Sequence, residues 1–155
     1  MSDFYAKICT NGHSIVERYP LRSVKYCEKC GAQLISKCPV CDSVIKEWHI
    51  NANVFYIPSF EKPLYCRSCG NPYPWTSAAI EATSAMIFED SRLSELEKKN
   101  LVDSLSDIIV ETPRTKVATI KIKKGLLACG KFTVESLRQF IIDFGCELAK
   151  SYLGL

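Results

Sequence analysis

The sequence Tyr26-Cys-Glu-Lys-Cys-Gly31 recurs further along the chain as Tyr65-Cys-Arg-Ser-Cys-Gly70. In both copies two residues separate a pair of cysteines, and glycine follows the pair. A turn of this length aims two sulfur atoms at one point, and glycine tolerates the left-handed conformation that lets backbone amides curl toward the sulfurs. The repeat therefore predicts half of a metal site at each place.

Two further half-sites complete the set. Cys38 and Cys41 have the same spacing, with Asp42 after the pair, and Cys9 is followed four positions later by His13. Four half-sites make two tetrahedral sites, the coordination that Zn2+ adopts in structural sites. We therefore predict two structural zinc ions per chain. The eight expected ligands are Cys9, His13, Cys27, Cys30, Cys38, Cys41, Cys66 and Cys69.

The sequence leaves the pairing of these half-sites open. A sequential arrangement joins the half-site at Cys9 with that at Cys27, and the half-site at Cys38 with that at Cys66. A crossed arrangement joins the first with the third and the second with the fourth. Loop-closure entropy changes too slowly with loop length to choose between the two.

Catalytic roles fit the cysteines less well than structural ones. A redox Cys-x-x-Cys motif lies at a strand-to-helix junction of a larger α/β domain. The sequence shows no pattern of such a domain. A catalytic zinc keeps one coordination position open, whereas both predicted sites have four protein ligands. Neither His13 nor His49 begins the His-x-Glu of a zinc deaminase, and the sequence has no glycine-rich phosphate loop. We therefore expect neither enzymatic activity nor a small-molecule substrate.

Residues 1–75 are predicted to form a double zinc-ribbon domain. About 75 residues with few large aliphatic side chains make a poor core without a metal. Runs of β-forming residues between the turns predict short strands. These runs are Ser14 to Arg18, Gln33 to Ile35, Val44 to His49 and Val54 to Ile57.

Residues 76–155 are predicted to form an all-α bundle of about four helices. Thr76 or Ser77 is expected to cap the first, which ends near Asp90. Ser94 and Glu97 form a capping box that opens the second. Pro113 stops that helix.

The sequence predicts the last two helices of the bundle with unequal clarity. Residues 115–128 alternate like a strand in their first half and read as helical in their second, and we favour a helix. Thr133 opens a strongly amphipathic final helix. Its apolar stripe is Leu137, Ile141, Phe144 and Leu148, flanked by Phe140 and Tyr152.

Composition bounds the class of protein. Of 155 residues, 47% are hydrophobic, which excludes a disordered chain. The sequence lacks the roughly 18 continuous apolar residues of a membrane span, and Met1 to Lys7 lack the apolar core of a secretory signal. We therefore expect a cytoplasmic location. The net charge of +3 lies entirely in residues 1–75, where seven thiolates and two Zn2+ would cancel it, so net charge gives no sign of nucleic acid.

Taken in order, the four cysteine half-sites, Cys69-Gly-Asn-Pro-Tyr-Pro-Trp75 and Glu111-Thr-Pro-Arg-Thr115 resemble a bacterial family of double zinc-ribbon proteins of unassigned function. The resemblance covers nearly the whole chain. It implies that residues 115–128 are helical. It implies no reaction.

Two kinds of partner are compatible with these features. The apolar stripe of the final helix predicts self-association or binding of a protein partner through the C-terminal helices. The alternative is nucleic acid bound by local basic clusters and aromatic side chains. Those residues are Arg18, Arg22, Lys25, Lys29, Phe55, Tyr56, Lys116, Lys121, Lys123, Lys124 and Lys131. Cys129, Cys146 and His49 lie outside the half-sites and are expected to be core or surface residues.

Overall fold

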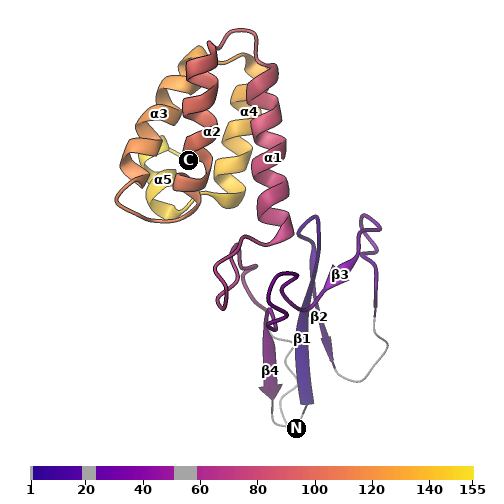
Figure 1. Ribbon diagram of the computed structural model, residues 1–155. Helices are drawn as coiled ribbons and strands as arrows, with labels where there is room; N and C mark the ends of the chain where they lie inside the picture. The colour runs from indigo at the N-terminus through magenta and orange to yellow at the C-terminus, as the bar shows by residue number, and fades with distance from the viewer. Residues whose placement is uncertain (1, 19–23, 51–58) are drawn as a thin grey trace. The chain divides into compact units, whose positions relative to one another are not determined.

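The computed structural model describes residues 2–18, 24–50 and 59–155, and the chain divides into two compact units (Figure 1). The units are Met1–Ala78 and Ala79–Leu155, so the division falls inside a helix, α1 (Pro74–Glu89). The strand expected at Val54 to Ile57 lies outside the described residues. A small antiparallel sheet with two cysteine clusters forms the first unit, and helices form the second.

The sheet is organised around β1 (Ser2–Cys9), which the sequence analysis missed. β1 pairs antiparallel with β2 (Ser14–Arg18), β3 (Leu34–Ile35) and β4 (Glu47–Ile50). Its buried side chains, Ala6 and Ile8, alternate with half-buried Tyr5 and Lys7. This alternation is the strand signal, but it is short and one of its apolar members is only alanine.

The strand predicted at residues 14–18 is confirmed, whereas the next two are shorter than expected. Gln33 makes an isolated bridge with Tyr26, and Val44 makes one with Lys37. Each bridge closes the base of a cysteine turn. Gln33 and Val44 therefore belong to the cysteine turns, although their β propensity alone predicts that they lie in the sheet.

The core of the first unit is built partly from the cysteines themselves. The Trp75 ring stacks on Tyr73 with centroids 4.6 Å apart, and its Nε1–H donates to the Pro63 carbonyl at 2.8 Å. One buried cluster consists of Ile8, Cys38, Ile45, Cys66, Tyr73 and Trp75. A second consists of Cys9, Cys27 and Leu34. Four of the eight predicted ligands, Cys9, Cys27, Cys38 and Cys66, are thus core residues as well.

Helix α1 begins at Pro74, so the cap predicted at Thr76 or Ser77 is wrong. Proline is favoured in the first turn because its missing N–H would have no partner there. The Tyr73 carbonyl accepts the N–H groups of Thr76 (2.9 Å) and Ser77 (3.1 Å). The buried Thr76 hydroxyl donates instead to the Leu64 carbonyl at 2.7 Å.

Four further helices follow. The capping box is confirmed: the Ser94 hydroxyl accepts the Glu97 N–H at 3.3 Å, and the Glu97 carboxylate accepts the Ser94 N–H at 2.8 Å. The helix expected over residues 115–128 is confirmed as well. The four are α2 (Glu95–Ile109), α3 (Thr115–Ala128), α4 (Lys131–Phe144) and α5 (Glu147–Leu153).

The prediction of one final helix from Thr133 onward is wrong. The helix ends at its C-cap, Gly145, and two helices, α4 and α5, occupy this part of the chain. A Cβ on Gly145 would lie 2.5 Å from the Ile141 carbonyl oxygen. The next residue, Cys146, donates its N–H to the Ile108 carbonyl at 2.9 Å. A contact with α2 therefore redirects the chain, and the described helices number five.

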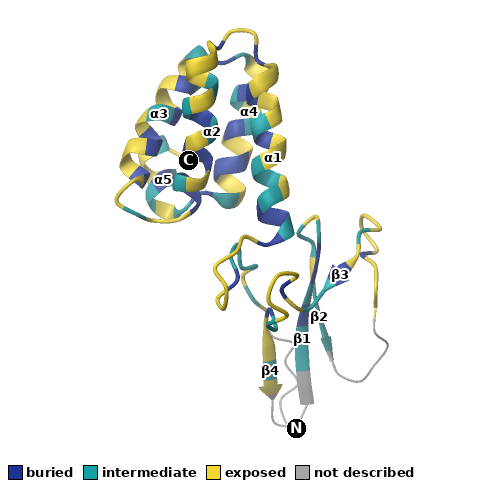
Figure 2. Cartoon of the chain, in the orientation of Figure 1, coloured by how far each residue is buried: buried dark blue, intermediate teal, exposed yellow. Residues whose placement is uncertain are grey.

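The stripe predicted as a docking surface belongs mainly to the core. Leu137 and Ile141 are fully buried and Phe140 nearly so, whereas Phe144 is half-buried. They share the interior with buried residues of α2 and α3 (Figure 2). These include Leu101, Leu105, Ile108, Ala118 and Ile122. Leu148 is half-buried as well, so the stripe itself gives no support to partner binding, whereas the flanking Tyr152 is 42% exposed.

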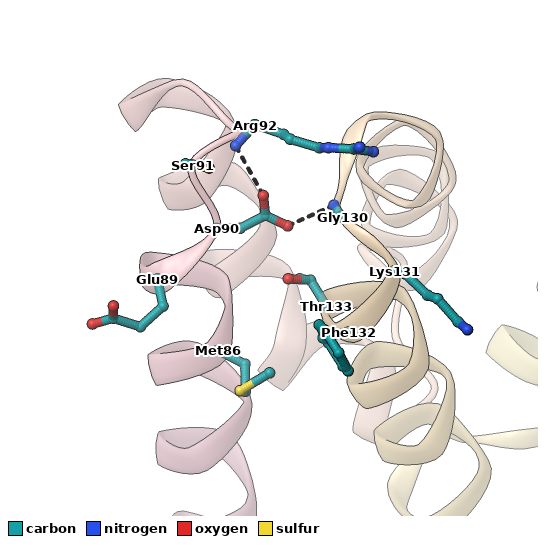
Figure 3. Close-up of a pocket in the computed structure, with 9 residues that line it drawn as sticks. All are labelled: Met86, Glu89, Asp90, Ser91, Arg92, Gly130, Lys131, Phe132 and Thr133. Carbon is teal, nitrogen blue, oxygen red and sulfur yellow. Dashed lines mark hydrogen bonds between the residues drawn. The ribbon is translucent and has the colours of Figure 1, made fainter.

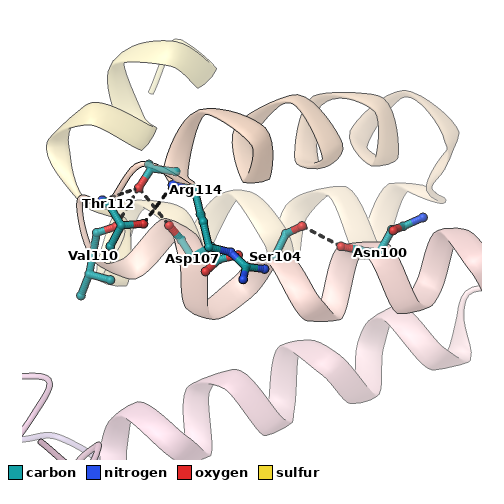
Figure 4. Close-up of polar contacts among 7 residues, drawn as sticks. Asn100, Ser104, Asp107, Val110, Thr112 and Arg114 are labelled. Atoms are coloured by element: carbon teal, nitrogen blue, oxygen red, sulfur yellow. Dashed lines mark hydrogen bonds and ion pairs between the residues drawn. The ribbon is translucent and has the colours of Figure 1, made fainter.

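Two buried polar side chains fix the connections between helices. The Asp90 carboxylate accepts the N–H of Gly130 at 2.7 Å and that of Arg92 at 2.9 Å, which ties the end of α1 to the start of α4 (Figure 3). The Thr115 hydroxyl accepts the Thr112 N–H at 2.9 Å and lies 2.9 Å from the Val110 carbonyl oxygen, so it can donate there (Figure 4). The Glu111-Thr-Pro-Arg-Thr115 motif is thus a structural turn between α2 and α3.

Within the described part of the chain, no helix combines the length and apolar character that crossing a membrane requires.

Candidate metal centres

Three cysteine turns share one backbone design. In each, the N–H of the residue after the second cysteine donates to the carbonyl of the first: Gly31 to Cys27, Asp42 to Cys38 and Gly70 to Cys66, at 2.8 to 2.9 Å. That following residue has positive φ: 71° at Gly31, 59° at Asp42 and 73° at Gly70. Gly12, inside the turn from Cys9 to His13, has φ 89°. The left-handed conformation predicted from the flanking residues is confirmed.

The first cluster joins Cys9, His13, Cys27 and Cys30. The His13 Nδ1 atom lies 3.6 Å from the sulfurs of both Cys9 and Cys27, and the Cys9 and Cys30 sulfurs are 3.7 Å apart. β1 supplies Cys9 at its last residue, and turns supply the other three. All four ligand atoms lie within 4.8 Å of one another.

The second cluster joins Cys38, Cys41, Cys66 and Cys69. The Cys38 and Cys69 sulfurs are 3.8 Å apart, and those of Cys41 and Cys66 are 3.6 Å apart. The half-sites are therefore paired sequentially, first with second and third with fourth. None of the nine cysteines, all of which lie in the described residues, forms a disulfide.

These distances fit a tetrahedral ion. Metal–sulfur bonds of about 2.3 Å place two sulfur ligands roughly 3.8 Å apart, and a nitrogen ligand at about 2.0 Å lies roughly 3.5 Å from each sulfur. The observed separations of 3.6 to 3.8 Å match both values. The residues present thus form two sites of the shape that a four-coordinate metal requires.

Polar neighbours stabilise the thiolate forms, and sequence reasoning missed them. Hydrogen bonding, first from the Ser43 hydroxyl and then from backbone N–H groups, lowers the pKa of Cys66 to about 5. Asn71 donates to the Cys69 sulfur at 3.4 Å and lowers the pKa of that thiol. The Ala32 N–H, together with Asn11, lowers the pKa of Cys30 to about 6. The sequence could have indicated these hydrogen bonds, because Asn11 and Asn71 lie within or directly beside the cysteine turns.

Burial acts in the opposite direction on two ligands. It raises the pKa of Cys9 and raises that of Cys38 to about 11. A metal ion must displace the protons of both thiols. Metal affinity is therefore expected to fall as the pH falls.

The other cysteines and His49 lie outside the clusters. Cys129 is buried at the end of α3, where burial raises the pKa of its thiol to about 11, which disfavours a reactive thiolate. Cys146 is half-buried in the link between α4 and α5. His49 lies in β4, opposite Asp3 and with its Nε2 4.0 Å from a Glu47 carboxylate oxygen.

The candidate nucleic-acid residues are divided between the two units and the residues that the structure does not describe. Lys25 and Lys29 are exposed beside the first cluster. Arg22, Phe55 and Tyr56 lie outside the described residues. The helical lysines belong to the other unit. Nucleic-acid binding remains a prediction.

The sheet, the clusters and the helices define the class of protein. It has a small β unit with two four-residue clusters of metal-site geometry, followed by a five-helix unit. A family profile matches residues 3–153, so the chain belongs to the family DUF2321, described as "uncharacterized protein conserved in bacteria". No curated protein and no solved structure matches the chain.

Proposed function

We propose that this is a non-enzymatic, cytoplasmic zinc protein that acts as an interaction module. Two structural zinc ions hold the N-terminal unit as a double zinc ribbon. The helical unit associates with a protein partner or with a second copy of the chain.

Structural rather than catalytic zinc is supported by the ligand count. Each cluster offers four protein donor atoms, which fills a tetrahedral ion and leaves no position for substrate or water. Seven of these donors are thiols, which favour zinc over hard cations, and the cytosol keeps such thiols reduced.

Exposure of large apolar side chains in the helical unit is the observation that carries the interaction role. Leu96, Leu127 and Phe132 are 71%, 90% and 76% exposed. Single exposed apolar residues are ordinary, whereas exposed apolar residues that form one patch are typical of a surface that another molecule covers. The proposed interaction role thus depends on these exposed side chains and no longer on the apolar stripe of α4, which is mainly buried.

The experiment is affinity capture from the native host combined with metal analysis of the same sample. We expect two zinc ions per chain and a protein that the wild type retains but a Leu96→Asp, Leu127→Asp, Phe132→Asp variant loses. Size-exclusion chromatography with light scattering detects self-association in the same pair. The matched control replaces three exposed polar residues with the same change of charge, Ser91→Asp, Ser106→Asp and Gln139→Asp. A strictly monomeric protein whose captured proteins are the same for wild type and triple variant would refute the interaction role.

A further inference from the structure

The outer face of α3 carries a pattern that the core does not explain. Its buried residues, Thr115, Ala118, Thr119, Ile122 and Gly125, occupy the side that faces the other helices. On the opposite side Val117 and Ile120 are each 56% exposed and Leu127 is 90% exposed. A helix that belongs to a small soluble unit would ordinarily present polar residues there.

The exposed positions have the spacing of a coiled-coil seam. Val117, Ile120, Lys124 and Leu127 are separated by three, four and three residues, so they occupy positions a, d, a and d of a heptad. At 100° per residue these four lie within one stripe along the helix. The seam has no partner helix among the described parts of the unit, since all four residues are exposed.

Lysines flank the seam on both sides. Lys116 and Lys123 take position g, and Lys121 takes position e. The segment Thr115–Ala128 contains four lysines and no acidic residue. Across the described chain, none of the four makes an ion pair, whereas Lys98, Lys131 and Lys150 on the neighbouring helices all do.

We propose that this seam, Val117, Ile120, Lys124 and Leu127 with the flanking lysines, binds an amphipathic helix of a partner protein that carries Glu or Asp at its own e and g positions. Charge complementarity at e and g selects partners in coiled coils. The proposal rests on the interaction role above and names the chemistry of the partner.

The lysines and the composition of the seam disfavour three other binding partners: a second copy of the chain, nucleic acid and a membrane surface. A second copy docked through the same seam would place lysines opposite lysines and Lys124 inside the interface. Nucleic acid would set phosphates against the three apolar side chains at the centre of the face, whereas basic and polar groups normally make those contacts. A membrane-surface helix needs a broader apolar face than three aliphatic side chains interrupted by a lysine.

The test uses a fluorescein-labelled three-heptad peptide with Leu at a and d and Glu at e and g, titrated with the full zinc-loaded chain and followed by fluorescence anisotropy. We expect a dissociation constant below about 100 µM at low salt, weakening at least fivefold at about 0.5 M salt because the charge pairs are screened. Lys116→Glu, Lys121→Glu, Lys123→Glu together should weaken binding at least tenfold. A peptide with Lys at e and g should bind that variant and not the wild type.

The matched control carries the same change of charge on other helices: Lys99→Glu, Lys131→Glu and Lys150→Glu. It should bind the acidic peptide within twofold of the wild type, and circular dichroism should show equal helix content in all three proteins. No binding of the acidic peptide, equal loss in the control, or no exchange of preference by the Lys peptide would each overturn the proposal. So would binding of DNA or anionic vesicles through these lysines without peptide binding. If the peptide fails while host capture still depends on Leu96, Leu127 and Phe132, the interaction role stands and only this partner chemistry falls.

Discussion

The contact between Gly125 of α3 and Leu101 of α2 allows a quantitative prediction. Gly125 is buried inside the helix, and a Cβ built on it would lie 2.8 Å from Leu101 Cδ1, 2.9 Å from Cγ, and closer still to Cδ2. Leu101 is only 1% exposed, so its side chain has little space into which to move. The absence of a side chain at residue 125 is what lets α3 approach α2 at this point.

Two opposing effects set the result of Gly125→Ala. Alanine in a helix interior is favoured over glycine by about 1 kcal/mol. Overpacking of a filled core costs about 1–3 kcal/mol, and the contact here involves three atoms of one branched side chain. We expect the clash to win, with a net loss of up to about 2 kcal/mol, or up to roughly 15 °C in the melting temperature of a unit of this size.

A double-mutant cycle separates the two effects. Leu101→Ala alone should cost about 2–5 kcal/mol because it leaves a cavity. In that background Gly125→Ala removes no space that leucine needs, so it should stabilise by up to about 1 kcal/mol. The free energies of unfolding are measured by urea denaturation of the zinc-loaded protein, following helical circular dichroism. Additive costs of the two changes, or a stabilising Gly125→Ala in the wild type, would refute this reasoning.

Three further predictions concern the metal sites, a buried carboxylate and a strained turn. Cys30→Ala or Cys69→Ala should each lower the zinc content from two ions per chain to one by elemental analysis, whereas Cys146→Ala should keep both; loss of both ions from either variant would show that the sites are not independent. Asp90, whose pKa is lowered mainly by the Thr133 hydroxyl and by backbone N–H groups, should stabilise α1 and α4 above pH 4 and lose that effect as the pH falls through its lowered pKa. Asp90→Asn should therefore destabilise at pH 7 by about 1–2 kcal/mol and by progressively less in acid, and a pH-independent difference in urea midpoint would contradict the assignment. Asp42→Gly should raise stability by up to about 1 kcal/mol in thermal unfolding, since φ is 59° there and the exposed ion pair with Lys37 contributes little, whereas an unchanged or lower melting temperature would show that the aspartate is not strained.

The candidate metal ligands were predictable because their geometry is local. Two residues between cysteines, with glycine or Asp42 after them, determine a turn within about five positions of the chain, and the structure has that turn three times. The capping box at Ser94 is local in the same sense. Which half-sites pair is a longer-range question, which the spacings left open and the structure resolves.

The elements that the sequence did not predict depend on distant contacts. β1 is a strand because three other segments pair with it, and Tyr5 and Lys7 give little sign of this in isolation. The helix break at Gly145 follows from the hydrogen bond of Cys146 to Ile108 in another helix. Burial of Leu137 and Ile141 likewise follows from where α2 and α3 lie, and an amphipathic stripe by itself does not distinguish a core from a docking face.

Sequential pairing of the half-sites has a consequence for synthesis. All four ligands of the first cluster, from Cys9 to Cys30, leave the ribosome before Cys38, the first ligand of the second. At roughly 5–20 residues per second, several seconds separate Cys30 from Cys69. The first site can close on its ion while the second is incomplete, so fewer unliganded thiols are exposed at one time than crossed pairing would leave. If each cluster binds an ion as proposed, the order of the ligands along the chain lets the nascent protein acquire its two metals one after the other.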